Sequence, residues 1–303
     1  MGYRKFKLKN SLDQEYLLTD QNFKHFFNSP SGLGFSKNLT GIRLGDRYKI
    51  TKREYDLPKP SGELVFYDST NEDKYDAYNE FIRFASFYPL RLYYYIPGNN
   101  KTEEESNSIF LNCEIQSASK SEIRHDDNTL RVPITFQGYS FWLSGTVKDI
   151  NLDITDPYEG TFTFPLSIPF TFGDDPLRNV RMPNLGTLIT PITLTIIGEC
   201  TDPYIRFFDA DGVEYAACKI NGTYDYVYVN ANDDEQEIRL SYNGIAIANP
   251  ADKQDLSIGN PDAEDFFLTF LKIKPGDTMA TISFANEFGG TISLKWRDEY
   301  ASI

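Results

Sequence analysis

Residues 69–95 read STNEDKYDAYNEFIRFASFYPLRLYYY, and this stretch decides the fold. Ser69 and Glu72 have the spacing of a capping box, in which two side chains satisfy free backbone amides at the start of a helix. Pro89 cannot continue a helix, and the run after it, residues 90–95, is dense in aromatic side chains that favour a strand. The stretch therefore predicts one helix that ends before Pro89, followed directly by a strand.

The predicted helix has an apolar stripe. Its members recur at the helical period and are joined by Phe81; they are Tyr75, Tyr78, Ile82 and Ala85. A helix of this kind normally covers the open face of a sheet, so core packing is the favoured interpretation. A second interpretation is that the aromatic excess faces a neighbouring subunit. We therefore treat Tyr75, Tyr78, Phe81 and Ile82 as candidate interface residues.

The residues before the helix predict short strands at 3–18, 47–55 and 63–67, separated by turn-forming residues. Between the first two lies the glycine-spaced run Gly32, Leu33, Gly34 and Phe35. The favoured interpretation of this run is a plain turn with one buried aromatic side chain, because glycine most often serves turn geometry. The other interpretation is a close backbone approach at a subunit contact, which makes these four residues a second set of interface candidates.

The chain after the helix predicts two further bodies of β structure. Strands at 109–116 and 130–137 complete a first domain over residues 1–144. Residues 145–190 are broken by prolines but are too aromatic for a flexible tether, which indicates a linker or an arm-like extension. Residues 191–303 contain evenly spaced short strands and predict a C-terminal β-sandwich of about eight strands. The predicted fold class is mainly β, with one amphipathic helix in the N-terminal domain.

Charge is divided unevenly along the chain, whose formal net charge is −14. Residues 1–150 hold 20 Lys or Arg against 20 Asp or Glu, whereas residues 151–303 hold 10 against 24. Such asymmetry indicates two bodies with different partners. The acidic half disfavours a nucleic-acid partner, since phosphate binding needs a basic surface. The sequence contains no run of about 18 apolar residues, so we expect no membrane span.

Residues that carry chemistry are sparse in the sequence. The three cysteines are far apart and lack metal-ligand spacing, and there are only two histidines. The order Asp209-Ala210-Asp211-Gly212 resembles the start of a calcium loop, but the later positions depart from that pattern and favour a hairpin turn. We expect no catalytic residue, no cofactor and no metal, and therefore no enzyme. Paired carboxylates for glycoside hydrolysis stay open, because such pairs are defined in space.

Three tyrosines predict a second kind of surface. Tyr224, Tyr226 and Tyr228 share one face of a strand by its period of two. Aromatic rings on a sandwich face can stack on sugars, since they supply a large contact area at low entropy cost. An ordinary sheet face packed against the core is the favoured interpretation of the same pattern.

An ordered set of short motifs resembles the distal tail proteins of siphophages. In the N-terminal part these are Phe6, 17–18, Gly32–Phe35, 62–66, the tyrosine-rich helix, 89–95, 113–115, 119–123, 133–136 and Trp142. In the C-terminal part they are 191–198, 274–277 and 295–300. The resemblance covers most of the chain.

This resemblance implies a structural hub in the virion, made in the cytoplasm of the bacterial host. The N-terminal domains of six copies would close a ring at the lower end of a long non-contractile tail. That ring would join the tail tube to the tail-associated fibre or lysin protein. The C-terminal sandwich, galectin-like or carbohydrate-module-like, would project outwards and could carry receptor-binding proteins, with residues 145–190 as a candidate arm.

The charge division fits such an assembly. A neutral N-terminal half removes one barrier to self-association, while acidic C-terminal halves repel one another and splay outwards. The alternative function is a carbohydrate-binding β-sandwich protein directed at glycans of the host cell surface. A binding module needs only the sandwich, whereas a hub needs the first domain to form oligomers.

Overall fold

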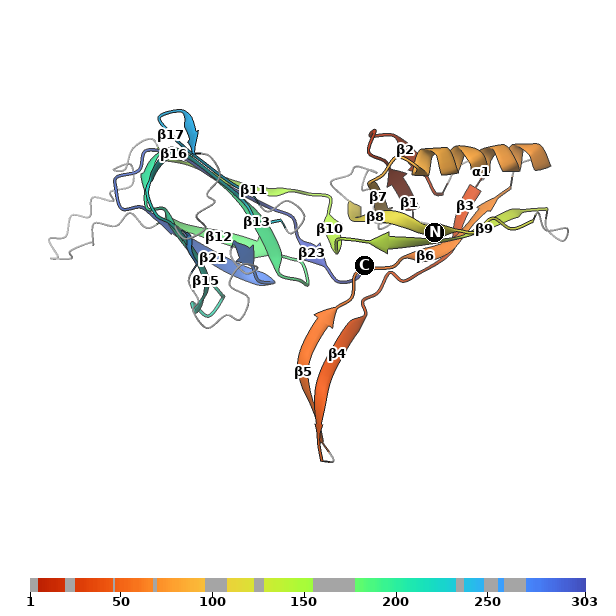
Figure 1. Cartoon of the computed structure of the whole chain (residues 1–303), viewed down its shortest axis with the longest axis horizontal. Coiled ribbons are helices and arrows are strands. Elements are labelled where there is room, and N and C mark those ends of the chain that lie inside the picture. The colour runs from red at the N-terminus through yellow and green to blue at the C-terminus, as the bar shows by residue number, and fades with distance from the viewer. Residues whose placement is uncertain are drawn as a thin grey trace, which may run out of the picture. The chain divides into compact units, whose positions relative to one another are not determined.

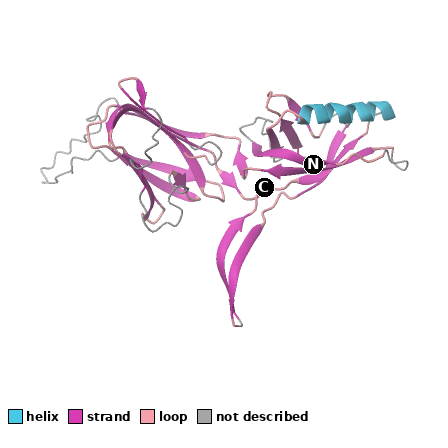
Figure 2. Ribbon diagram, viewed as in Figure 1, coloured by secondary structure: helices cyan, strands magenta, loops and turns pink. Residues whose placement is uncertain are grey.

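The computed structural model describes residues 5–19, 25–45, 47–67, 70–95, 108–122, 128–154, 178–232, 237–247, 256–258 and 271–303. Strands dominate these residues, which contain a single helix, so the predicted mainly β fold class is confirmed (Figure 2). Two compact units share the chain. The first comprises residues 1–146 and 299–303, and the second comprises residues 147–298.

The first unit is built on one antiparallel sheet with the strand order β2-β1-β7-β8-β9-β6-β3. Its strands are β1 (Lys5–Lys9), β2 (Glu15–Leu17), β3 (His25–Ser31), β6 (Ser61–Phe66), β7 (Leu90–Tyr95), β8 (Ser108–Ala118) and β9 (Leu130–Gly138). A bridge between Thr19 and Phe26 links the chain after β2 to β3 at the opposite edge. The sheet therefore curls back on itself around one aromatic core.

Helix α1 (Asn71–Ala85) begins one residue later than the predicted capping box. Its N-cap is Thr70, whose Oγ1 accepts a hydrogen bond from the backbone N–H of Asp73 at 3.1 Å. Ser69 lies outside the described residues, and Glu72 is not the capping partner. The spacing Thr70–Asp73 repeats the spacing Ser69–Glu72, so the sequence alone does not choose between the two registers.

The buried face of α1 overlaps the predicted stripe only in part. Lys74, Phe81 and Phe84 are the buried residues of the helix. Tyr75 and Tyr78 are only half-buried, and Ile82 is 37% exposed. Phe81 packs in the core of the first unit together with side chains of the sheet, such as Phe66 and Leu92. The helix thus covers the sheet, as the core-packing interpretation expects, but it does so through Phe81 and Phe84.

A long hairpin leaves the first unit between β3 and β6 (Figure 1). It consists of β4 (Lys37–Leu44) and β5 (Arg47–Tyr55), which pair only with each other. The predicted strand at 47–55 is β5, whereas its partner β4 has no counterpart among the predicted strands. The hairpin projects from the side of the first unit opposite to α1 (Figure 1).

The second unit is a sandwich of two antiparallel sheets over one core. One sheet has the order β11-β22-β13-β16-β17-β18, with β20 paired to β13. Its strands are β11 (Lys148–Ile154), β13 (Thr190–Thr201), β16 (Thr223–Asn230), β17 (Glu237–Tyr242), β18 (Ile245–Ile247), β20 (Lys272–Ile273) and β22 (Gly290–Trp296). The other sheet has the order β12-β21-β14-β15-β19. Its strands are β12 (Arg178–Asn184), β14 (Tyr204–Phe208), β15 (Glu214–Ile220), β19 (Leu256–Ile258) and β21 (Gly276–Ser283).

Two strands of this sandwich, β11 and β12, come from the segment 145–190 for which the sequence indicates a linker or arm. β11 pairs along its length with β22, and β12 pairs along its length with β21. This pairing supplies hydrogen-bond partners for their backbone N–H and C=O groups. Residues 155–177, between them, lie outside the described residues. The last strand, β23 (Glu299–Tyr300), pairs with β10 (Trp142–Ser144) in the sheet of the first unit, although the sequence analysis places it with the sandwich.

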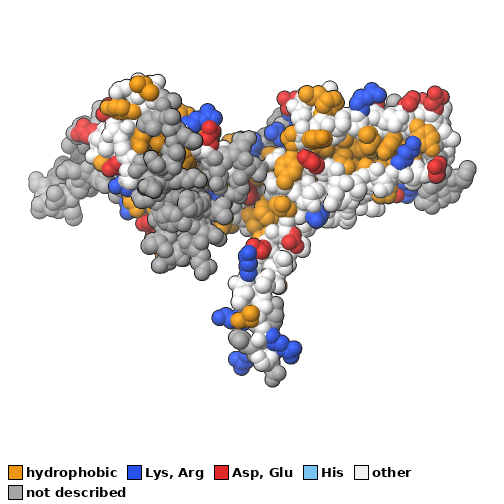
Figure 3. Space-filling model, in the orientation of Figure 1, with side chains coloured by type: hydrophobic (Ala, Val, Ile, Leu, Met, Phe, Trp, Pro, Cys, Tyr) orange, Lys and Arg blue, Asp and Glu red, His pale blue; other side chains and the backbone are white. Residues whose placement is uncertain are grey.

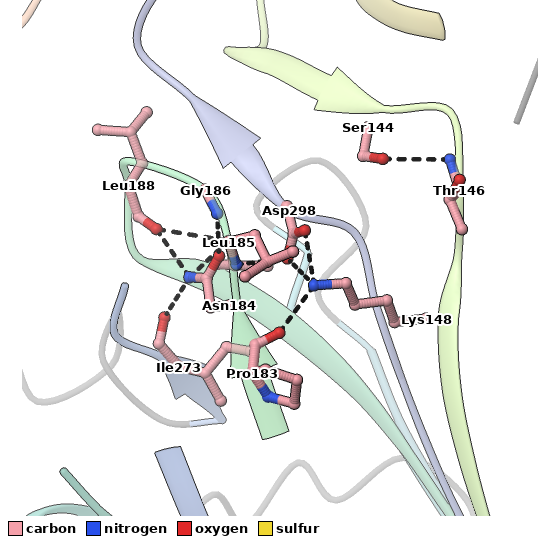
Figure 4. A network of polar contacts seen from close by, with 11 residues as sticks. Ser144, Thr146, Lys148, Pro183, Asn184, Leu185, Gly186, Leu188, Ile273 and Asp298 are labelled. Carbon is pink, nitrogen blue, oxygen red and sulfur yellow. Dashed lines mark hydrogen bonds and ion pairs between the residues drawn. The ribbon is translucent and has the colours of Figure 1, made fainter. Parts of the chain in front are cut away.

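A buried polar network ties the two ends of the second unit together (Figure 4). The Lys148 Nζ forms an ion pair with Asp298 at 2.7 Å and donates to the backbone carbonyl of Pro183 at 2.8 Å. Asp298, with a side chain only 4% exposed, also accepts from the backbone N–H of Leu185 at 3.2 Å. Beside it the buried Asn184 donates to carbonyls of Leu188 and Ile273. The strand by which the chain enters the second unit, β11, and the residue by which it leaves, Asp298, are thereby held to the end of β12.

Candidate assembly surface

The loop at residues 32–35 lies at the base of the hairpin, where β3 passes into β4. Gly32 has φ +71°, and a Cβ atom there would lie 2.2 Å from the backbone oxygen of Lys59. Only glycine fits such a close approach, and here the approach is to the same chain. Leu33 is half-buried, and its carbonyl accepts a hydrogen bond from the backbone N–H of Ile303 at 3.1 Å. Gly32 and Leu33 therefore anchor the loop.

Phe35, in contrast, is displayed at the surface. Its side chain is 58% exposed, so the buried aromatic of the turn interpretation is not found. The ring packs edge-on against Tyr55 with centroids 5.7 Å apart, and Tyr55 in turn contacts Phe141. The Lys37 Nζ lies 4.4 Å from the Tyr55 ring centroid and 5.5 Å from that of Phe35. These rings and the cation pack together at the base of the hairpin.

A groove of about 830 Å³ opens beside this aromatic cluster. Its walls include Gly34, Phe35, Asn38, Glu54, Asp56 and Leu57. Gly34 has open space around its Cα, so nothing within the first unit requires glycine there. Apolar rings beside carboxylates and an amide make a surface suited to a protein partner.

The hairpin beyond this base has no core of its own. Leu39 and Ile42 are 47% and 52% exposed, and none of the residues of β4 and β5 whose burial is described is buried. Residues 37–55 hold six Lys or Arg against two Asp or Glu, and Figure 3 shows basic side chains along the projection. A two-stranded ribbon is only marginally stable by itself in water.

The helix candidates lie elsewhere on the unit. The rings of Tyr75 and Tyr78 are covered by Lys120, whose Nζ lies 4.1 Å and 5.5 Å from their centroids. Phe81 is fully buried, which removes it from the surface. Ile82 remains exposed. The structure thus brings together residues 32–35 and the hairpin, but it places α1 on the opposite side of the unit (Figure 1).

Reactive side chains do not gather in the part of the chain that the structure describes. Within it, no group of three or more His, Cys, Asp or Glu side chains could hold a metal ion. Cys113, Cys200 and Cys218 are free and buried, and burial raises the pKa of each thiol to about 12. These thiols are protonated and inert at neutral pH.

Comparisons with known proteins identify the first unit. The model of a family described as the N-terminal domain of the distal tail protein matches residues 5–139. No curated protein matches the chain. A chain of the phage P2 baseplate, in its activated conformation with Ca, is similar with a TM-score of 0.51 and 15% identity over 100% of both chains. The SPP1 Dit protein is similar with a TM-score of 0.60 and 12% identity over 97% of this chain and 98% of its own.

The SPP1 protein is described as a paradigm of the hub adsorption apparatus in phages that infect Gram-positive hosts. At these identities the two structures show a shared fold alone, which here extends over both units.

The chain is therefore a structural protein of a phage tail, and it is not an enzyme. Residues 5–139 are an N-terminal domain of the distal tail protein family, and the resemblance noted in the sequence is confirmed over that domain. As a tail protein it is a component of the virion. In the described residues, no helix is long and apolar enough to cross a membrane.

Proposed function

We propose that six copies of this protein close a ring at the tail tip, which joins the tail tube above to the tail-associated fibre or lysin protein below. The chain is made in the cytoplasm of the bacterial host and then enters the virion. The N-terminal domain, residues 1–144, forms the ring. The sandwich, which takes β11 and β12 from the segment 145–190, carries receptor-binding proteins.

The hairpin β4–β5 is the observation that supports self-assembly. It exposes apolar side chains on β4 and basic side chains on both strands, and none of its residues whose burial is described is buried. Monomeric proteins rarely maintain such a ribbon, because its backbone order costs entropy that buried contacts have to offset. A contact made by one protruding surface with a different surface of the next copy is heterologous, and it closes into a ring when the rotation allows it.

The test compares the full chain with a variant in which residues 38–54 are replaced by Gly-Gly. Light scattering gives the mass in solution, and negative-stain images of the same fraction give the symmetry. We expect six-fold rings for the full chain and monomers for the variant, with circular dichroism confirming that the variant is folded. Rings of equal stability without the hairpin would contradict the proposal.

A second candidate function is glycan binding by the outer face of the sandwich sheet. Tyr226 and Tyr228 are half-exposed on β16, and Arg239 of β17 lies 5.6 Å from the Tyr228 ring centroid. Thr195 is paired with Tyr228 across β13 and adds a hydroxyl beside the rings. Rings with an adjacent cation and hydroxyl suit a sugar ring and its hydroxyl groups.

Tyr224 does not join this face. A register shift between Ile197 and Cys200 turns it inward, where its hydroxyl donates to the carbonyl of Asn221 at 2.6 Å. The test is binding of the full chain to purified cell-wall polysaccharide, with Tyr226→Ala/Tyr228→Ala as the variant. We expect the variant to lose binding, and equal binding by both proteins would reject this candidate.

A further inference from the structure

The outer face of helix α1 carries a regular row of negative charge. Glu72, Asp76 and Glu80 are exposed and recur every four residues, so they lie on one side of the helix. Their Cα atoms are spaced by about 6 Å, from a rise of about 1.5 Å per residue. Arg83 is the exposed cation in the last turn of the same helix, and the other cation of the helix, Lys74, is buried.

One face of the hairpin carries a matching row of positive charge. The register pairs Lys52 with Thr40 and Lys49 with Ile42, and it places Arg47 on the same face two residues further along. The shift between Thr40 and Gly41 absorbs one residue of β5, so Lys52 and Lys49 stay on one side although they are three residues apart. All three cations are exposed, and Lys52 also contacts Glu54 at 2.7 Å.

The two rows have nearly the same repeat. Alternate residues of a strand are about 6.7 Å apart, and residues at i and i+4 of a helix are about 6 Å apart. Three charges of each sign can therefore meet with a mismatch of only about 1–2 Å over the whole row, which long Lys and Arg side chains accommodate. The rows lie on opposite sides of the first unit, so the contact has to join different copies (Figure 1).

We propose that the basic face of the β4–β5 hairpin in one copy docks along the acidic face of α1 in the next copy. This inference rests on the proposed ring and names the surface that receives the hairpin. Complementary rows of charge favour this pair of surfaces over contacts between like-charged surfaces, and a shift by one repeat leaves a charge at each end of the contact unpaired. The buried helix face, with Phe81 and Phe84, keeps the acidic row in place during docking.

The test uses two full-length charge-reversal variants. The hairpin variant is Arg47→Glu/Lys49→Glu/Lys52→Glu, and the helix variant is Glu72→Lys/Asp76→Lys/Glu80→Lys. We expect each variant alone to assemble at least about tenfold more weakly than the wild type in light scattering at low salt. An equimolar mixture should recover rings, because each hairpin then meets a helix of opposite charge. Alternating copies close only in an even-numbered ring, so recovered six-fold rings contain three copies of each.

A matched control reverses three exposed acids of the second unit, Glu199→Lys/Asp211→Lys/Glu214→Lys, and changes the net charge as the helix variant does. It should assemble like the wild type. Thermal unfolding followed by circular dichroism checks that every variant is folded, and Glu72→Gln/Asp76→Asn/Glu80→Gln gives a milder helix variant if the reversal unfolds.

The outcomes separate this inference from the ring itself. If the hairpin variant fails to assemble while the helix variants form normal rings, the hairpin docks elsewhere and the inference is overturned with the ring intact. A mixture that stays dissociated would also overturn it. If the wild type is monomeric at every concentration, the proposed ring fails and the inference fails with it.

Discussion

The β4–β5 hairpin and the sandwich of the second unit are both made of antiparallel strands, yet they differ in what lies beneath them. The sandwich strands bury alternate residues, such as Leu194 and Ile196 of β13, in a shared core. The hairpin strands bury almost nothing, and Ile42 is more than half exposed. Regular hydrogen bonding alone therefore says little about stability, which in the sandwich comes from its buried apolar core.

The largest expected effect tests this contrast directly. Leu194→Ala in the sandwich core should lower the free energy of unfolding by about 3 kcal/mol, because it removes buried methyl groups and leaves a cavity. Ile42→Ala in the hairpin should change it by less than about 0.5 kcal/mol, since that side chain is exposed in the monomer. Urea unfolding under conditions that keep the protein monomeric measures both. Similar losses of unfolding free energy at the two positions would contradict the contrast between the sandwich core and the hairpin.

The next effect concerns the network that fastens the sandwich. Asp298→Ala should lower the free energy of unfolding of the second unit by about 2 kcal/mol, because it leaves the partly buried Lys148 without its carboxylate. This figure is below that of a fully buried pair, since Lys148 is partly exposed. The double variant Lys148→Met/Asp298→Leu should recover most of the loss. Thermal melts of the two variants give the comparison, and an unrecovered loss would mean that the carboxylate has a further role.

The helix cap gives a smaller effect in the first unit. Thr70→Ala should cost about 1 kcal/mol, because the backbone amide of Asp73 loses its acceptor at the helix start. Asn79→Ala, on the exposed side of the same helix, is the control and should be nearly neutral. Chemical unfolding followed at the helix signal distinguishes the two. Equal effects would place the cap at another residue.

The smallest expected effect concerns the chemical reactivity of the three cysteine thiols. In the folded protein Cys113, Cys200 and Cys218 should not react with a thiol reagent at pH 8, because burial raises their pKa to about 12. A pKa raised on folding gives stability that is complete below the ordinary thiol value of 9.0 and is lost as the pH rises towards about 12. Mass spectrometry after brief labelling reads each site. Rapid labelling of Cys113 alone would show that the first unit opens independently.

Local chemistry predicts the features that depend on neighbouring residues. The helix before Pro89, the strand after it and the hairpin at Asn243 and Gly244 all appear, the last with positive φ at both turn residues. The predicted stripe is right at Phe81, which is buried, but it includes the exposed Ile82 and omits the buried Phe84. The apolar period alone does not rank neighbouring positions at the edge of a buried helix face.

Features without a local signal are not predictable in this way. β4 lacks the alternation of apolar and polar residues because neither of its faces is buried in the monomer. The pairing of β23 with β10 joins residues more than 150 positions apart. Neither short segment contains a sequence pattern that identifies the other as its partner. The interface roles of the 32–35 loop and of α1 depend on a second molecule, so they stay predictions. Phe81 alone is removed from that set by its burial.

The return of the chain to the first unit has a consequence for the order of synthesis. Residues 299–303 leave the ribosome after the whole sandwich, and yet Ala301 is buried in the first unit and Ile303 bonds to the loop that supports the hairpin. A nascent chain can fold most of its first sheet early, but it cannot finish the base of the hairpin until residues 299–303 have been made. Completion of the first unit therefore waits for synthesis of the second.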